Sequence, residues 1–105
     1  MEKLIERIEN TGWSVEKEGN NEYRIGKFSP SGQDFSVTIE GDSTKELIDS
    51  IYEAYVDYAI SEETYLWLDD SGHGANGAPY LMRDVLEDME ACKQMIVELY
   101  GELSE

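Results

Sequence analysis

The chain has 105 residues and a formal net charge of −16, with 24 acidic and eight basic residues. This length fits one domain, residues 1–105, and the 40% hydrophobic content is enough for a single core. Direct binding to nucleic acid or to an anionic membrane is disfavoured, because an acidic surface repels phosphates. The single cysteine excludes an internal disulfide, and no signal-peptide or membrane-span pattern is present. We therefore expect a protein of the reducing cytoplasm.

The first 41 residues predict one short helix followed by three strands. Apolar residues recur at helical spacing up to the helix-ending sequence at 10–12 and then alternate with polar ones between turn signals. The helical positions are Leu4, Ile5 and Ile8, and the alternating ones are Trp13, Val15, Tyr23, Ile25, Phe35, Val37 and Ile39. Such strands predict an antiparallel meander with one apolar and one polar face.

The rest of the chain predicts helices. Ser43 and Glu46 have the spacing of a capping box, and the apolar stripe that follows predicts a helix to about Ala59. A short helix is expected over residues 62–69, a loop over 70–79, and a last helix from about Tyr80 to Leu103. The order αβββαα, with the short helix as an addition, is typical of an α+β domain whose helices pack on one face of the sheet.

Acidic residues are concentrated in the helical part of the sequence. Residues 46–105 contain 15 acidic residues and only two basic ones, Arg83 and Lys93, for a net charge of −13. On a helix with about 100° per residue, four carboxylates fall in one band roughly 80° wide: Glu46, Asp49, Glu53 and Asp57. The loop and the last helix are expected to extend this surface with Asp69, Asp70, Asp84, Glu87 and Asp88.

Two interpretations of these acidic faces remain open. A charge run is usually a solvated helix face, but exposed helices normally mix Glu with Lys at i,i+4 spacing. Here the helix from Ser43 to Ala59 has one basic residue, Lys45, in its first turn. The second interpretation is a surface that replaces the phosphates of a nucleic acid and binds a cleft rich in Arg and Lys.

The segment from Asp69 to Pro79 is the most distinctive string of the chain. Its acids and its histidine match neither the spacing of a calcium-binding EF-hand nor that of a zinc site, so we expect no metal. Glycines at 72, 74 and 77 suit tight turns or close backbone approach. A purely structural role for the loop fits its composition better, but loops of this length often carry contacts, so His73, Asn76 and Tyr80 are predicted contact residues.

No catalytic constellation stands out in the sequence. The chain has one histidine and one cysteine, and Cys92 lies on the apolar side of the last helix, where a buried thiol is expected. Acid pairs are frequent only because acids are frequent, so they do not indicate a glycosidase. We expect a protein that is not an enzyme and has no cofactor.

The chain resembles two groups of known proteins. The stretch ETYLWLDD at 63–70, followed by GHG at 72–74 and NGAPY at 76–80, resembles small proteins carried by mobile elements of gut bacteria. The element order and the acidic later helices resemble some type II-A anti-CRISPR proteins. This second resemblance implies binding to the guide-loaded Cas9 nuclease, at the place where Cas9 reads the PAM duplex, by imitation of DNA.

These observations give two hypotheses of different classes. The first is an acidic DNA mimic that blocks the nucleic-acid-binding cleft of a defence nuclease, most specifically Cas9 with its guide RNA. The second is a non-enzymatic interaction or regulatory module of a mobile element, which is acidic for solubility only.

Overall fold

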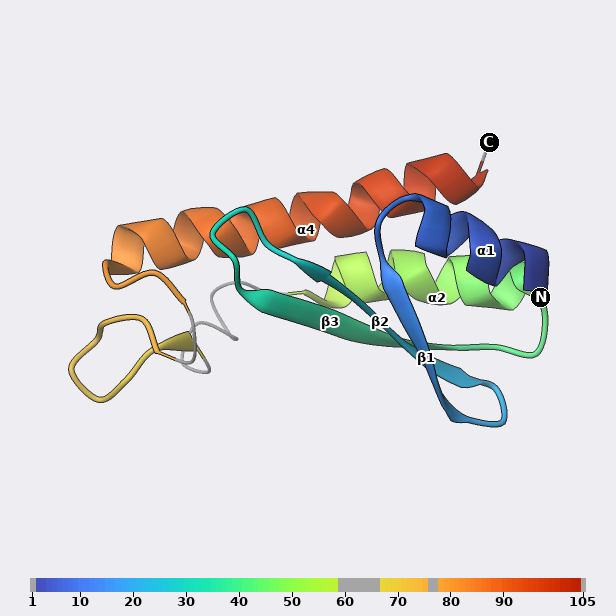
Figure 1. Cartoon of the computed structure of the whole chain (residues 1–105), viewed down its shortest axis with the longest axis horizontal. Helices are drawn as coiled ribbons and strands as arrows, with labels where there is room; N and C mark the ends of the chain where they lie inside the picture. The colour runs from blue at the N-terminus through green and yellow to red at the C-terminus, as the bar shows by residue number, and fades with distance from the viewer. Residues whose placement is uncertain (1, 59–66, 76–77, 105) are drawn as a thin grey trace.

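The computed structural model describes residues 2–58, 67–75 and 78–104 (Figure 1). The predicted αβββαα order is confirmed. The elements are α1 (Glu2–Asn10), β1 (Ser14–Gly19), β2 (Glu22–Phe28), β3 (Asp34–Glu40), α2 (Thr44–Asp57) and α4 (Met82–Ser104). The last helix begins at Met82 and not at Tyr80.

Only the last residues of the short helix expected over residues 62–69 belong to the described part of the chain. Residues 62–66 lie outside the described residues. Leu68 instead forms an isolated antiparallel bridge with Gly74, so the prediction that a helix continues to Asp69 is wrong. Trp67, which directly precedes this bridge, has a 3₁₀-helical conformation and is 9% exposed.

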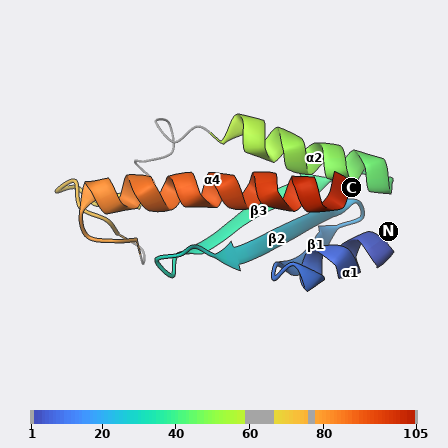
Figure 2. The ribbon, with the colours of Figure 1, turned by 90° about the horizontal axis from the view of Figure 1, so that it is seen from above.

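The sheet is the predicted meander, with strand order β1-β2-β3 and both pairs antiparallel. Its register aligns Val15 with Ile25 and Ile25 with Val37, so apolar residues from all three strands share one face. The helices cover that face, and α4 lies between α2 and α1 with contacts to both (Figure 2). Because α4 is central, one of its sides faces α2 and the other faces α1.

The helix α2 begins where the sequence predicts it. The Ser43 side chain accepts a hydrogen bond from the Glu46 backbone N–H at 3.2 Å. The Glu46 carboxylate in turn accepts one from the Asp42 backbone N–H at 2.6 Å, one residue before the cap. The first bond satisfies an amide group that the helix start leaves without an intrahelical partner, and both bonds fix the entry of the chain into α2. The buried Leu47 and Ile51 then hold the inner face of the helix in the core.

The inner face of α4 matches the predicted stripe. Its buried apolar side chains are Val85, Met89, Cys92, Ile96, Leu99 and Leu103. None of the helices within residues 2–58, 67–75 and 78–104 is long and apolar enough to cross a membrane.

We expect the thiol of Cys92 to be inert in the folded protein. It has no exposed surface, and burial, with a smaller contribution from the charge of Asp88, raises its pKa to about 12. With that pKa, roughly one thiol in ten thousand is ionised at pH 8, and only the thiolate is nucleophilic. A thiol-reactive dye at pH 8 should label the protein in guanidinium but not in buffer. Labelling of the folded protein at the rate of a free thiol would contradict this prediction.

Candidate acidic binding surface

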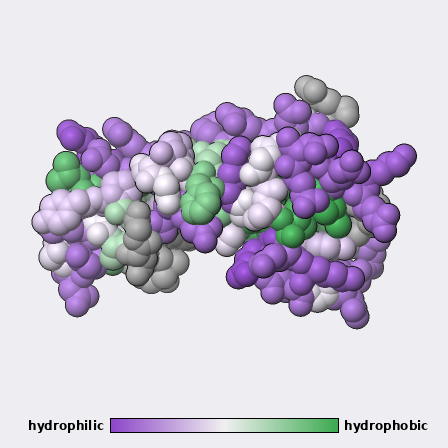
Figure 3. Space-filling view, in the orientation of Figure 1, coloured by the Kyte–Doolittle hydropathy of each residue, from purple (hydrophilic) through white to green (hydrophobic). Residues whose placement is uncertain are grey.

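The exposed carboxylates of α2 form the candidate site. We call Glu46, Asp49, Glu53 and Asp57 the α2 band, and all four are exposed. They lie on the side of the helix opposite the buried Ile51, as the sequence predicts, because both sets follow the helical period. Hydrophilic side chains also cover most of the face of the molecule seen in Figure 3.

The α2 band has an inner pair in the first half of the helix, Glu46 and Asp49, and an outer pair in the second half, Glu53 and Asp57. The two pairs differ in their local partners. Glu46 is engaged at the helix cap, and Asp49 forms an ion pair with Lys45 at 2.9 Å. That hydrogen bond and charge raise the pKa of the Lys45 ammonium. Within the described part of the chain, Glu53 and Asp57 have no ion pair. The second half of α2 therefore presents uncompensated negative charge.

A shallow hollow of about 300 Å³ lies between α2 and β3. Glu53 and Asp57 line one side of it, and Thr38 and Glu40 line the other. The Ser50 hydroxyl accepts a hydrogen bond from the Glu40 backbone N–H at 3.0 Å, which ties the end of this edge strand to α2. Glu40 thus joins the acidic surface, although the sequence analysis did not include it. The sequence indicates that Glu40 lies on the polar face of a strand, but it does not indicate that α2 packs beside that strand.

The acidic residues of α4 occupy a different part of the surface. Asp84 and Glu87 line a hollow of about 290 Å³ with Pro30 and Ser31 of the turn after β2. This turn lies on the side of α4 away from α2 (Figure 2). Asp84 and Glu87 were expected to extend the surface of α2, but α4 itself separates the two faces.

Asp88 is not a surface residue at all, which corrects the sequence-based assignment. It is 3% exposed. Its carboxylate accepts hydrogen bonds from the Ser29 hydroxyl at 2.5 Å and from the Ser31 backbone N–H at 3.1 Å. The turn after β2 covers most of it, so Asp88 connects the sheet to α4 and adds almost nothing to the exposed acidic surface.

The loop before α4 is organised by one carboxylate. Asp69 Oδ1 accepts hydrogen bonds from the Ser71 hydroxyl at 2.6 Å, the Ser71 backbone N–H at 2.9 Å and the His73 backbone N–H at 3.1 Å. These bonds, that of the Ser71 hydroxyl above all, lower the pKa of Asp69 because they favour its charged form. Asp69 therefore has a local structural role, whereas Asp70 is exposed.

The predicted contact residues of this loop have separate outcomes. The rings of His73 and Tyr80 stack with centroids 3.9 Å apart and planes 11° apart, and Tyr80 is 66% exposed. Asn76 lies outside the described residues. Gly74 meets the close-approach requirement, because a Cβ there would lie 1.6 Å from the Pro79 carbonyl oxygen. Within the described residues, no three His, Cys, Asp or Glu side chains are grouped to hold a metal ion.

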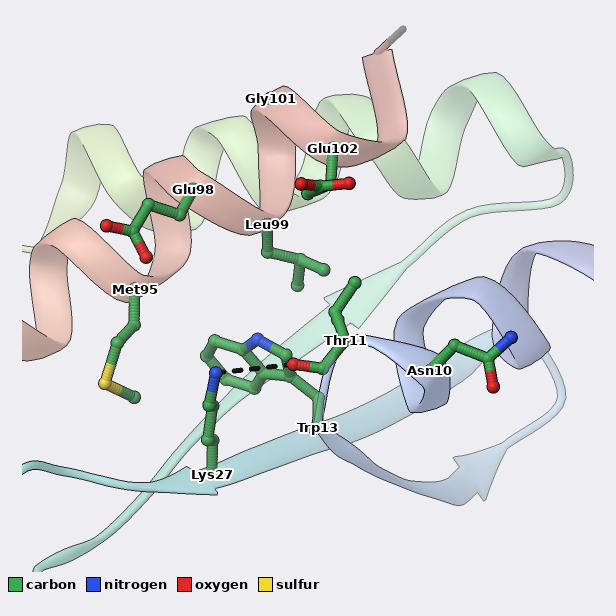
Figure 4. A pocket seen from close by; sticks show the side chains of 9 residues that line it. All are labelled: Asn10, Thr11, Trp13, Lys27, Met95, Glu98, Leu99, Gly101 and Glu102. Atoms are coloured by element: carbon green, nitrogen blue, oxygen red, sulfur yellow. Dashed lines mark hydrogen bonds between the residues drawn. The ribbon is translucent and has the colours of Figure 1, made fainter.

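A larger groove of about 650 Å³ lies between the end of α1, β2 and the second half of α4 (Figure 4). Trp13 and Leu99 face each other in it, and the Lys27 ammonium donates a long hydrogen bond to the Thr11 carbonyl at 3.4 Å. The remaining lining residues are Asn10, Met95, Glu98, Gly101 and Glu102. The Thr11 hydroxyl and the Lys27 ammonium donate to the backbone carbonyls of Ile8 and Thr11, and neither donates to a carboxylate of the lining.

No protein-family model, curated protein or solved structure matches the chain. The candidate site therefore rests on the geometry of the α2 band and its surroundings.

Proposed function

We propose that the protein is an acidic DNA mimic that inhibits a nuclease by occupying its nucleic-acid-binding cleft. The single observation that carries the proposal is the exposed α2 band, whose outer carboxylates Glu53 and Asp57 have no ion pair among the described residues. Successive members of the band are separated by roughly 4.5 to 6 Å along the helix axis, given a rise of about 1.5 Å per residue. This spacing is of the same order as the roughly 3.4 Å between charges along one strand of DNA.

The concentration of charge also supports a basic partner. A small domain needs a net charge of only about 2 to 8 in magnitude for solubility. The chain carries −16, and self-repulsion on this scale opposes folding. A cleft of Arg and Lys would relieve that repulsion on binding and would attract the protein at long range. Acidity for solubility alone, the competing hypothesis, accounts for a smaller charge.

The Cas9–guide RNA complex is the first partner to test, because of the resemblance in element order and charge to type II-A anti-CRISPR proteins. Its PAM-reading arginines are suitable receptors for carboxylates. We expect the protein to bind this complex with an affinity that falls at least tenfold between about 50 and 200 mM salt. A short duplex containing the PAM should compete for the same site.

The measurement is a titration at both salt concentrations, with and without that duplex. DNA cleavage should also decrease as the protein is added, which separates inhibition from mere binding. Absence of binding at either salt concentration would reject Cas9 as the partner. Binding that is insensitive to both salt and duplex would contradict mimicry and favour an interaction module that is acidic for solubility only.

A further inference from the structure

Two exposed apolar side chains lie beside the α2 band. Tyr52 is 46% exposed and Val56 is 56% exposed, and the i,i+4 spacing places them one above the other on α2. Asp49 precedes Tyr52 by three positions and Glu53 precedes Val56 by three positions, so each carboxylate neighbours one of the two apolar side chains on the helix surface. A strip of apolar surface therefore adjoins carboxylates on a single rigid element.

The ring of Tyr52 is held in place by other aromatic residues. Its centroid lies 5.0 Å from that of Tyr100 on α4 and 6.2 Å from that of Tyr55, with interplanar angles of 48° and 44°. The Lys93 ammonium lies 5.3 Å from the centre of the Tyr55 ring. This cluster joins α2 to α4, so little conformational entropy is lost when a partner contacts Tyr52.

The neighbouring carboxylates determine what kind of group fits this strip. An arginine side chain can stack its planar guanidinium on an aromatic ring while it pairs with a carboxylate beside that ring. Tyrosine and arginine are also enriched among the residues that dominate protein–protein affinity. A neutral apolar partner would leave the adjacent carboxylates desolvated and unpaired, which is costly.

We propose that Tyr52 and Val56 form an anchor for an arginine-bearing basic surface of the partner. The inference rests on the proposed function and deepens it: the interface has an apolar component that duplex DNA cannot reproduce. The α2 band would then supply attraction that weakens with salt, and the anchor would supply affinity that persists at high salt. Both components would act from the same face of α2.

The test compares single variants for affinity to the Cas9–guide complex at about 50 and 200 mM salt. We expect Tyr52→Ala to weaken binding about tenfold at both concentrations, because truncation of an interface anchor commonly costs more than 1 kcal/mol. Tyr52→Phe retains the ring and should stay within about twofold of the unmodified protein. Val56→Ser should weaken binding severalfold, and its exposure means that the fold does not depend on it.

Leu81→Ser is the matched control, since Leu81 is 46% exposed but precedes α4 and lies outside α2. It should bind like the unmodified protein. A double variant that reverses two charges of the α2 band, Glu53→Lys with Asp57→Lys, separates the two proposals. Unchanged affinity of Tyr52→Ala and Val56→Ser, together with weak binding of this double variant, would overturn the anchor and leave mimicry intact. Full binding by the charge-reversed band would overturn the proposed function, and with it the basic partner that the anchor requires. Equal losses from Leu81→Ser and Val56→Ser would also overturn the anchor.

Discussion

Reversal of the two outer carboxylates of the α2 band, Glu53→Lys with Asp57→Lys, should lower affinity for the Cas9–guide complex by about 100-fold at low salt. In a basic cleft each new lysine replaces an attraction with a repulsion, and like charges across an interface cost several kcal/mol. A 100-fold change corresponds to about 2.8 kcal/mol. The loss should shrink as salt is raised, because ions screen exposed charges.

The control is Glu6→Lys with Glu9→Lys on α1. Both glutamates are exposed, and the two double variants change the net charge equally. Neither variant should unfold the protein. None of the four substituted carboxylates has an ion pair to lose among the described residues, and removal of like-charge repulsion is mildly favourable. Equal losses of affinity from both double variants would mean that only the net charge of the protein matters, and not the position of the charges. Unchanged affinity of the α2 variant would remove α2 from the interface and refute the proposed function.

The substitution Asp88→Ala should lower the free energy of unfolding by about 3 kcal/mol, because two hydrogen bonds to a buried carboxylate are lost. Ser29 also accepts a hydrogen bond from the Gln33 backbone N–H at 2.9 Å, so its hydroxyl links the turn after β2 to α4. Loss of Asp88 leaves the Ser29 hydroxyl and the Ser31 backbone N–H without this acceptor. Chemical denaturation of the variant and of the unmodified protein measures the effect.

The substitution Glu87→Ala provides the comparison. Glu87 is next to Asp88 in the sequence, but its carboxylate is exposed and makes no such hydrogen bond to the turn. It should change the free energy of unfolding by no more than about 0.5 kcal/mol. Asp88→Asn keeps an acceptor oxygen and should fall between the two. If Asp88→Ala were as stable as Glu87→Ala, the buried carboxylate would not hold the turn to the helix.

Local patterns in the sequence were sufficient for most of the fold. The switch from helical to two-residue periodicity after α1 and back at Ser43 predicted the order of elements, because each period places apolar side chains on one face of one element. The capping box at Ser43 and Glu46 and the burial of Cys92 followed from the same kind of information. The α2 band was also predictable, since all its members lie on one helix.

Only the tertiary structure decided how these elements meet. Asp88 and Glu87 are adjacent acids on one helix, yet a turn nearly 60 residues earlier in the chain covers Asp88 and leaves Glu87 exposed. The placement of α4 between α1 and α2 separates two acidic faces that appear continuous in the sequence. Glu40 and the Tyr52–Tyr100 contact likewise depend on neighbours from distant segments. Periodicity specifies the buried face of an element, whereas long-range packing determines which other segment covers it.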